Sequence, residues 1–215
     1  SSYYFRRINC PPTDTLSNDG KGEPTAYTGM TWSGFRPSDD ACTYGYLIPS
    51  NMFAVVALGY LEEMEREIFH NEELAERAKA LKEEIQRAIE TIGKTFTEEF
   101  GMVYAYETDG YGMYNLMDDA NVPSLLAMSY LGYEGEPEVS SNTRRFLLSE
   151  ANPFYFKGDK AAGIGSPHTP SNYIWHIAMA IQGLTSETRE EKLEILKNMA
   201  ATTGGKGVMH EGFCC

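Results

Sequence analysis

The chain has 215 residues, of which 42% are hydrophobic and 23% are charged, and its formal net charge is −13. This length fits one large domain or two small ones, and the composition is that of a globular protein rather than a disordered one. An acidic chain repels phosphate groups, so the charge argues against nucleic acid and anionic membranes as partners. No apolar run approaches the length of a membrane span, and residues 1–8 lack the pattern of a signal peptide.

The four cysteines, Cys10, Cys42, Cys214 and Cys215, do not have the spacing of zinc ligands. Cys214 and Cys215 are adjacent, and disulfide geometry resists pairing between neighbours. We therefore expect free thiols in a reducing compartment and a cytoplasmic location.

The first half of the chain predicts an irregular arm and two helices. Residues 1–34 lack periodicity and contain several prolines and glycines, which is typical of an arm laid on a surface. Residues 51–64 are apolar on most sides, which predicts a buried helix, and Pro49 suits its first turn. Residues 71–92 have apolar side chains every three or four positions, which predicts an amphipathic helix with one wet face.

The remaining elements follow the same alternation. Two short segments, 103–107 and 111–116, flank Thr108-Asp109-Gly110 and predict a β-hairpin. Four further helices are expected: an apolar one over 122–131, a half-polar one over 142–149, an apolar one over 172–184 and an amphipathic one over 187–201.

Buried and one-faced helices thus alternate as three pairs. An α/α barrel requires this arrangement, because its inner ring has no wet face and its outer ring has one. The sequence therefore predicts an all-α fold in which residues 1–215 form one part of an α/α barrel, with a small β-hairpin. The inner helices near 51–64, 122–131 and 172–184 should pack side by side, with their partners outside.

Segments rich in polar and aromatic residues precede the predicted inner helices, at 32–41, 114–121 and 163–170, and a fourth lies near the end of the chain, at 208–213. In chain order these are the first to fourth polar motifs. Inner helices of a barrel run in the same direction, so these segments should meet at one mouth. The acidic and histidine side chains placed there are Asp39, Asp40, Asp118, Asp119, His168, His210 and Glu211, and the aromatic ones include Trp32, Tyr44 and Trp175. Two carboxyl groups and aromatic faces for sugar rings are what glycoside hydrolysis requires.

Some of these residues have structural alternatives. Asp118 and Asp119 precede Asn121 closely enough for one of them to cap the next helix, whereas Asp39 and Asp40 lie too far before Pro49 to cap theirs.

Histidines raise two further alternatives. His176, inside an apolar helix, is expected in the core or behind the site. A metal site built from His168, His176 and His210 is a rival chemistry, but no pair has the spacing of a helical zinc motif.

Four segments resemble the mannosidases of glycoside hydrolase family 125. They are WSGFRPSDDACTYGYLIPSNMF (32–53), YNLMDDANVPSLL (114–126), GIGSPHTPSNYIWHIAMAIQGLTS (163–186) and MHEGF (209–213). The resemblance implies an (α/α)6 barrel and an exo-acting, inverting α-1,6-mannosidase that cleaves α-mannoside oligosaccharides without a metal or other cofactor. It also implies that the general acid falls on the Asp39–Asp40 pair and the general base on Glu211. Candidate mannose contacts in the matching motifs are Arg36, Asp118, Asp119, Asn121, His168 and Trp175.

A complete barrel of this kind has six helix pairs, so we expect the chain to be a central-to-C-terminal piece. Two other functions remain open. The first is an inactive carbohydrate-binding remnant of such an enzyme. The second is a helical interaction scaffold, which gives no reason for four polar segments at one end. The sequence does not indicate the oligomeric state.

Overall fold

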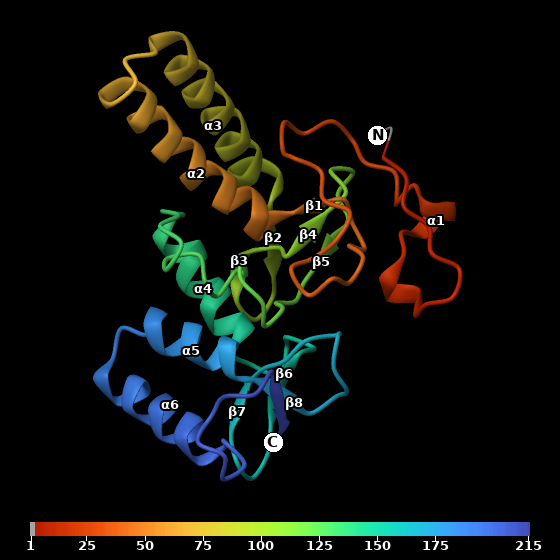
Figure 1. The fold of residues 1–215 in the computed structure, drawn as a ribbon, viewed down its shortest axis with the longest axis vertical. Helices are drawn as coiled ribbons and strands as arrows, with labels where there is room; N and C mark the ends of the chain where they lie inside the picture. Colours follow the sequence, from red (N-terminus) through yellow and green to blue (C-terminus); the bar gives the residue numbers. More distant parts are fainter. Residues whose placement is uncertain (1–2) are drawn as a thin grey trace.

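The computed structural model describes residues 3–215 (Figure 1). Its helices are α1 (Ser17–Gly20), α2 (Ile48–Glu67), α3 (Glu72–Ile92), α4 (Pro137–Leu147), α5 (His176–Thr185) and α6 (Arg189–Ala201), with a 3-10 turn at Pro12–Asp14. Its strands are β1 (Tyr46–Leu47), β2 (Lys94–Thr97), β3 (Gly101–Tyr104), β4 (Glu107–Thr108), β5 (Tyr114–Asn115), β6 (Tyr155–Lys157), β7 (Ala162–Ile164), β8 (Tyr173–Trp175) and β9 (Gly212–Cys214). The described chain is therefore mostly helical, with a few small strands.

The helices α2 and α3 form a hairpin that extends from the body of the molecule (Figure 1). The predicted amphipathic helix is α3, and its first turn is capped by Asn71, whose side chain accepts a hydrogen bond from the Leu74 amide. Its buried residues are Ala75, Ala78, Ile85, Ala88 and Ile89. The three- and four-residue spacing of these side chains is the signal that predicted the helix.

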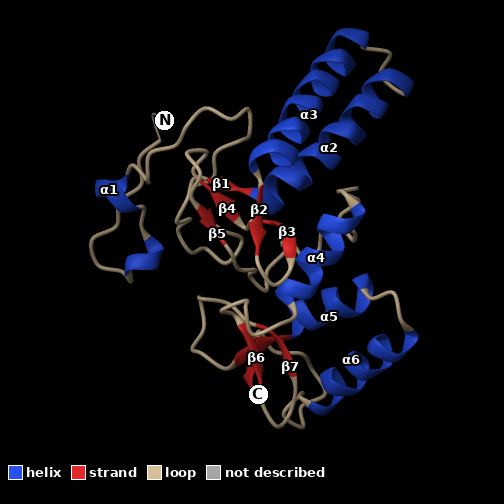
Figure 2. Cartoon of the chain, turned by 180° about the vertical axis from the view of Figure 1, so that it is seen from behind, coloured by secondary structure: helices blue, strands red, loops and turns tan. Residues whose placement is uncertain are grey.

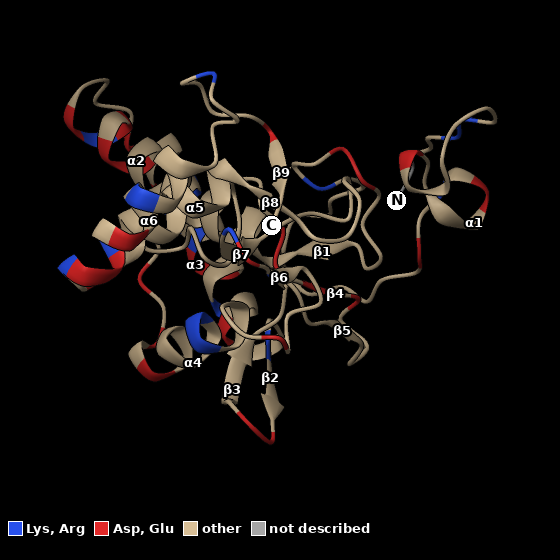
Figure 3. Cartoon of the chain, turned by 90° about the horizontal axis from the view of Figure 1, so that it is seen from below, with Lys and Arg blue, Asp and Glu red and all other residues tan. Residues whose placement is uncertain are grey.

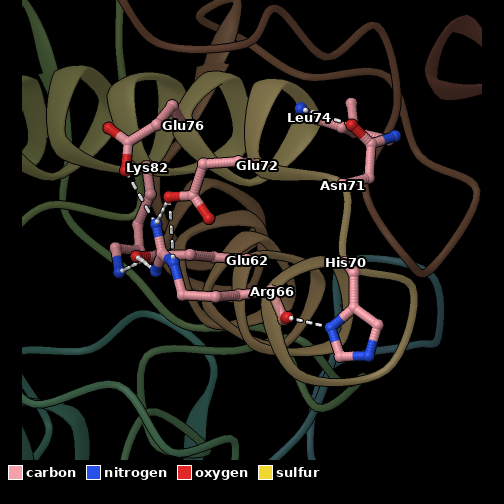
Figure 4. Close-up of polar contacts among 8 residues, drawn as sticks. All are labelled: Glu62, Arg66, His70, Asn71, Glu72, Leu74, Glu76 and Lys82. Carbon is pink, nitrogen blue, oxygen red and sulfur yellow. Dashed lines mark hydrogen bonds and ion pairs between the residues drawn. The ribbon is translucent and has the colours of Figure 1, made fainter.

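An ion-pair network holds the tip of this hairpin (Figure 4). The guanidinium of Arg66 lies 2.8 Å from Glu62, 3.2 Å from Glu72 and 2.7 Å from Glu76. Lys82 of α3 also bonds Glu62 of α2 at 2.6 Å. The network joins the two helices beyond the point where α2 has buried side chains.

The helices α2 and α5, both predicted as inner helices, expose apolar side chains in the described chain. The buried residues of α2 all lie between Ile48 and Val55, and further along Tyr60 is 61% exposed. Phe53 is also exposed, as are Ile177 and Leu184 of α5. Within the described chain, neither α2 nor α5 is therefore buried on all sides.

The predicted inner helix over 122–131 is also wrong, because this segment forms consecutive turns. The cause is that side-chain oxygens, rather than helical backbone carbonyls, accept hydrogen bonds from the amides of this segment. The carboxylate of Asp118 accepts the backbone N–H groups of Leu125 and Leu126, and the Ser124 hydroxyl accepts that of Ala127. Side chains satisfy these donors, so the apolar segment packs into the core without becoming a helix. Two helix pairs and the separate α4 replace the three expected pairs.

The predicted hairpin exists in a shorter form. Thr108 pairs with Tyr114 and Glu107 with Asn115, in the antiparallel pair β4–β5. The other side of β4 pairs with β1, which makes β4 the central strand of a three-stranded sheet. Residues 103–104, expected in the same hairpin, belong to β3 and pair with β2.

The second helix pair, α5–α6, lies at the other end of the molecule, with α4 between the two pairs (Figures 1 and 2). The strand β8 directly precedes α5 and pairs with β9 near the end of the chain. Charged residues of both signs lie along α6, whereas α4 carries only Glu138, Arg144 and Arg145 (Figure 3). No helix in residues 3–215 is both long and apolar enough to cross a membrane.

The arm that precedes β1 is irregular apart from the 3-10 turn and the short α1. It is nevertheless attached to the rest of the chain at defined points. The Phe5 ring meets the Phe35 ring edge-on at 5.1 Å, and the Ala26 amide donates to the carbonyl of Asp109. The arm therefore lies beside the segment that carries the first polar motif.

Candidate active site

The Asp39–Asp40 pair lies at the tip of a tight loop. The Arg36 amide donates to the Asp40 carbonyl at 2.8 Å, and the Asp39 amide donates to the Arg36 carbonyl at 3.0 Å. Asp39 has a φ of 68°, a left-handed conformation that is uncommon for residues other than glycine. The two side chains consequently have different surroundings: Asp39 is exposed, whereas Asp40 is 1% exposed.

Asp40 meets the third polar motif through His168. Oδ2 of Asp40 lies 3.5 Å from Nδ1 of His168 and, within the described chain, has no hydrogen-bond partner. The imidazole is partly open, with 41% of its side chain exposed. The Ser166 hydroxyl accepts the His168 amide and helps to fix the loop.

A surface hollow of about 410 Å³ lies over this contact. Its lining residues are Tyr3, Phe5, Arg7, Asp14, Phe35, Asp39 and His168. Aromatic rings, a cation, carboxylates and an imidazole are groups that bind sugar hydroxyls and sugar faces. Asp39 and His168, predicted from separate motifs, thus share one depression.

The two buried carboxylates of the second motif, Asp118 and Asp119, have different partners. Asp118 is fully buried and accepts two backbone N–H groups at 2.9 Å, from Leu125 and Leu126. Burial raises the pKa of Asp118 to about 7, against the opposing effect of these two hydrogen bonds. Asp118 therefore has a structural role, as the sequence allowed for one of the two aspartates, but the segment that it binds forms turns rather than a helix.

Asp119 joins the second motif to the first. It accepts a hydrogen bond from the Ser38 hydroxyl at 2.7 Å, while its other carboxyl oxygen is buried without a hydrogen-bond partner among the described residues. Burial raises the pKa of Asp119, and the Ser38 hydroxyl opposes that rise. Next to it, the Ala120 amide donates to the Gly165 carbonyl at 3.1 Å. Three motifs are thus directly bonded to one another.

The fourth motif reaches the third through the β8–β9 pair. Trp175 pairs with Gly212, and its indole N–H donates to the Thr169 hydroxyl at 2.9 Å, beside His168. Glu211 precedes Gly212, is exposed, and makes no hydrogen bond or ion pair within residues 3–215. The structure therefore links the backbone of Glu211 to the site but leaves its carboxylate unattached.

The two remaining histidines have structural contacts. Nδ1 of His176 accepts the His210 amide at 3.2 Å, and Nε2 lies 2.9 Å from the Thr202 hydroxyl. The Thr202 hydroxyl donates to the Asn198 carbonyl, so this pattern fits a His176 protonated on Nε2. His210 lies 3.2 Å from the Thr203 carbonyl through Nε2. Both histidines therefore secure the segment that leads to Glu211.

Two other residues that were predicted to bind the sugar, Trp32 and Tyr44, do not line this hollow. Trp32 is half-buried in a cradle of Gly22, Gly34 and Gly45, with the Tyr3 ring 5.7 Å away. Tyr44 lines a neighbouring surface hollow of about 840 Å³.

The backbone of Asn121 lowers the pKa of Asp119, against the effect of burial. Among residues 3–215, no three His, Cys, Asp or Glu side chains are grouped to bind a metal ion.

Glu107 is a residue that the sequence interpretation missed. It is fully buried in β4 and accepts a hydrogen bond from Nε of Arg36 at 2.6 Å. Burial disfavours the charge of Arg36, but the Glu107 carboxylate outweighs this effect and raises the pKa of Arg36. The signal in the sequence was a single carboxylate within the apolar run Val103-Tyr-Ala-Tyr-Glu107. Arg36 itself, predicted to contact mannose, is 8% exposed.

Comparison with known proteins identifies relatives along the whole chain. The family model for metal-independent alpha-mannosidases (GH125) matches residues 1–215. The meiotically up-regulated gene 157 protein of Schizosaccharomyces pombe is 42% identical over 212 residues, which cover 97% of this chain and 42% of that protein.

A solved Streptococcus pneumoniae structure is also similar, and it is described as a non-productive substrate complex of a metal-independent alpha mannosidase with alpha-1,6-mannobiose. It is 50% identical and superimposes with a TM-score of 0.96, over 99% of this chain and 51% of that one. The chain thus spans about half the length of these relatives. With the family model matched from end to end, the chain belongs to the GH125 family of metal-independent α-mannosidases.

Proposed function

We propose that this chain carries much of the active site of an exo-acting, inverting α-1,6-mannosidase. Family membership supports the reaction class, and the mannobiose held by the Streptococcus pneumoniae relative supports the linkage. The observation that carries the proposal is the hollow lined by both Asp39 and His168, with Asp40 buried behind the imidazole.

Asp39 is proposed as the general acid. Of the two adjacent aspartates, Asp39 is exposed and lines the hollow, whereas Asp40 as a residue is only 1% exposed. Its left-handed backbone turns the carboxyl outward, and strained conformations of this kind concentrate at functional sites. Asp40 then has a separate role, which is to fix the orientation of His168.

Glu211 is proposed as the general base. In an inverting reaction one carboxyl group protonates the glycosidic oxygen while the other activates a water molecule on the opposite face of the sugar. This geometry needs a gap of roughly 6.5–9.5 Å between the two groups. The Glu211 side chain is exposed, so its carboxylate is accessible to such a water.

Asp119 is proposed as a contact for sugar hydroxyls. One of its oxygens is buried without a hydrogen-bond partner in the described chain, although a buried acceptor normally has a donor. A mannose hydroxyl is proposed as that donor, which requires the groups that cover the oxygen to move when the sugar binds. The bond from Ser38 to the other oxygen keeps the carboxylate in place.

Product stereochemistry tests this function. The protein that contains this chain is mixed with α-1,6-mannobiose, and the anomeric proton signal is followed from the first minutes. Inversion predicts β-mannose as the first product, whereas α-mannose would overturn the mechanism and the role of Glu211. Asp39→Asn and Glu211→Gln should each lower turnover by about 10²–10⁴-fold, the usual contribution of an acid or base. Exo action further predicts no cleavage when the terminal mannose is blocked.

A mannoside-binding protein without turnover is the alternative, and the unattached Glu211 carboxylate is the observation that favours it. Binding of mannobiose measured by calorimetry, together with no released mannose, would select this alternative.

A further inference from the structure

We infer that Glu107 is a positioning residue that holds the Asp39–Asp40 loop in its working shape, an inference that rests on the function proposed above. The evidence is the set of partners that this single buried carboxylate connects. Oε1 accepts from Nε of Arg36 at 2.6 Å. Oε2 accepts from the Thr43 amide at 3.0 Å, the Tyr44 amide at 3.2 Å and Nδ2 of Asn115 at 3.1 Å.

These partners lie on both sides of the two aspartates. Arg36 precedes the loop tip, whereas Thr43 and Tyr44 follow it, so Glu107 fastens the loop at both of its ends. The loop closes on itself above this point through the Phe35–Ala41 bridge. The side chain of Glu107, which belongs to strand β4, therefore fixes the shape of this loop.

The strand that carries Glu107 is itself fixed. In the three-stranded sheet, Glu107 pairs with Leu47 of β1 on one side and with Asn115 of β5 on the other. The side chain is fully buried, so no water competes for its oxygens. A rigid strand thus supports the loop, which is the arrangement that holds catalytic groups most accurately.

The partners also explain why the residue must be a carboxylate. All four groups around Glu107 are donors, and an ionised carboxylate is the side chain that offers two acceptor oxygens. Glutamine has the same shape but turns an NH₂ group toward donors at one end. Aspartate keeps the charge but is one carbon shorter, so it reaches either Arg36 or the two loop amides.

The matched control is Glu90, a second carboxylate that accepts several donors. It accepts hydrogen bonds from the hydroxyls of Tyr104 and Tyr133 and from Lys94, none of which lies in the Asp39–Asp40 loop. Glu90→Gln should weaken the fold locally and leave the loop unchanged. It separates a general loss of stability from an effect on the loop.

The experiment combines steady-state kinetics on α-1,6-mannobiose with hydrogen exchange, using the whole protein. Glu107→Gln should lower kcat by about 10²-fold with KM changed less than about 3-fold, because a misplaced acid acts on the transition state rather than on binding. Glu107→Asp should fall between this variant and the parent. The amides of residues 36–44 should exchange at least about 10-fold faster in Glu107→Gln and at the parent rate in Glu90→Gln.

Each result decides the inference. Parent-like kcat and parent-like loop exchange in a folded Glu107→Gln protein overturn it. If Glu107→Gln does not fold, Glu107→Asp decides by the same two measurements, and a loss of kcat of about 10-fold or more supports the role. If the parent protein does not hydrolyse mannobiose, the proposed function fails. Hydrogen exchange of the loop amides then remains as the test of whether Glu107 holds the loop.

Discussion

Nδ1 of His168 lies 3.5 Å from Oδ2 of Asp40, an oxygen with no hydrogen-bond partner among residues 3–215. The carboxylate is buried, whereas the imidazole is partly exposed and lines the hollow. The position of the imidazole therefore depends on the carboxylate behind it. This dependence leads to a prediction about how their variants combine.

His168→Ala and Asp40→Asn should each weaken the affinity for α-1,6-mannobiose by about 10-fold, the size of one lost charge-assisted contact. The double variant should lose no more than the worse single variant, because both changes remove the same oriented imidazole. Calorimetric titration of the four proteins measures the coupling. Additive losses would show that the two residues act independently and would contradict the pairing.

The buried carboxyl of Asp118 predicts a pH dependence of stability. Burial raises its pKa from the ordinary 3.8 to about 7. Between these values the native protein binds more protons than the unfolded chain, so the contribution of Asp118 to stability falls as the pH rises through this window and levels off above it. The full difference corresponds to roughly 4 kcal/mol.

Asp118→Asn removes this titration without changing the shape of the side chain. The free energy of unfolding of the parent protein minus that of the variant should decrease from pH 4 to pH 7, as measured by urea denaturation. The opposite slope would mean that the hydrogen bonds from Leu125 and Leu126 outweigh burial and lower the pKa.

Asp118 also shows where sequence interpretation of the fold reaches its limit. The helix α3 could be predicted because its apolar spacing and its cap at Asn71 are local signals. The segment 122–131 has an equally apolar pattern, but the acceptor for its amides is the side chain of Asp118 outside the segment. Periodicity does not reveal such a bond, so the predicted helix was wrong.

In the candidate site, too, some features could be predicted from local sequence and others depend on contacts between distant segments. The four motifs were visible as polar segments, and the contacts between Ser38 and Asp119 and between Asp40 and His168 show three of them together. Which of two adjacent aspartates faces outward depends on the backbone of Asp39, which the residue types alone do not determine. Glu107 was missed because its burial arises from pairing with β1 and β5.

The bond between Trp175 and Thr169 should stabilise the loop that carries His168. Trp175→Phe removes the indole donor and Thr169→Val removes its acceptor. Each should lower the free energy of unfolding by about 0.5–1.5 kcal/mol, the usual net value of one hydrogen bond. Each should also weaken mannobiose affinity, because a looser loop leaves His168 less well oriented.

Thr97→Val serves as the control for this pair. Thr97 bonds within the β2–β3 hairpin, to the Gly101 carbonyl and the Phe100 amide. Its loss should lower stability by a similar amount and leave mannobiose affinity at the parent value. An equal loss of affinity in all three variants would refute a specific role for the loop.

We predict that the packing of the Trp32 indole leaves no room for a side chain at position 45. A Cβ at this position would overlap the indole nitrogen of Trp32 and approach the Thr25 methyl group to 2.7 Å. Gly45→Ala must therefore displace the indole, and overpacking of this kind costs about 1–3 kcal/mol. Gly59→Ala, in the interior of α2, meets Lys82 at an ordinary 3.7 Å and should instead stabilise the helix by about 0.5–1 kcal/mol. Urea denaturation of both variants tests the opposite signs.

Because the chain has two tryptophans, the same comparison in a Trp175→Phe background isolates Trp32 fluorescence. A shifted emission in Gly45→Ala is expected, and an unchanged emission with parent stability would show that Trp32 does not depend on the glycine cradle.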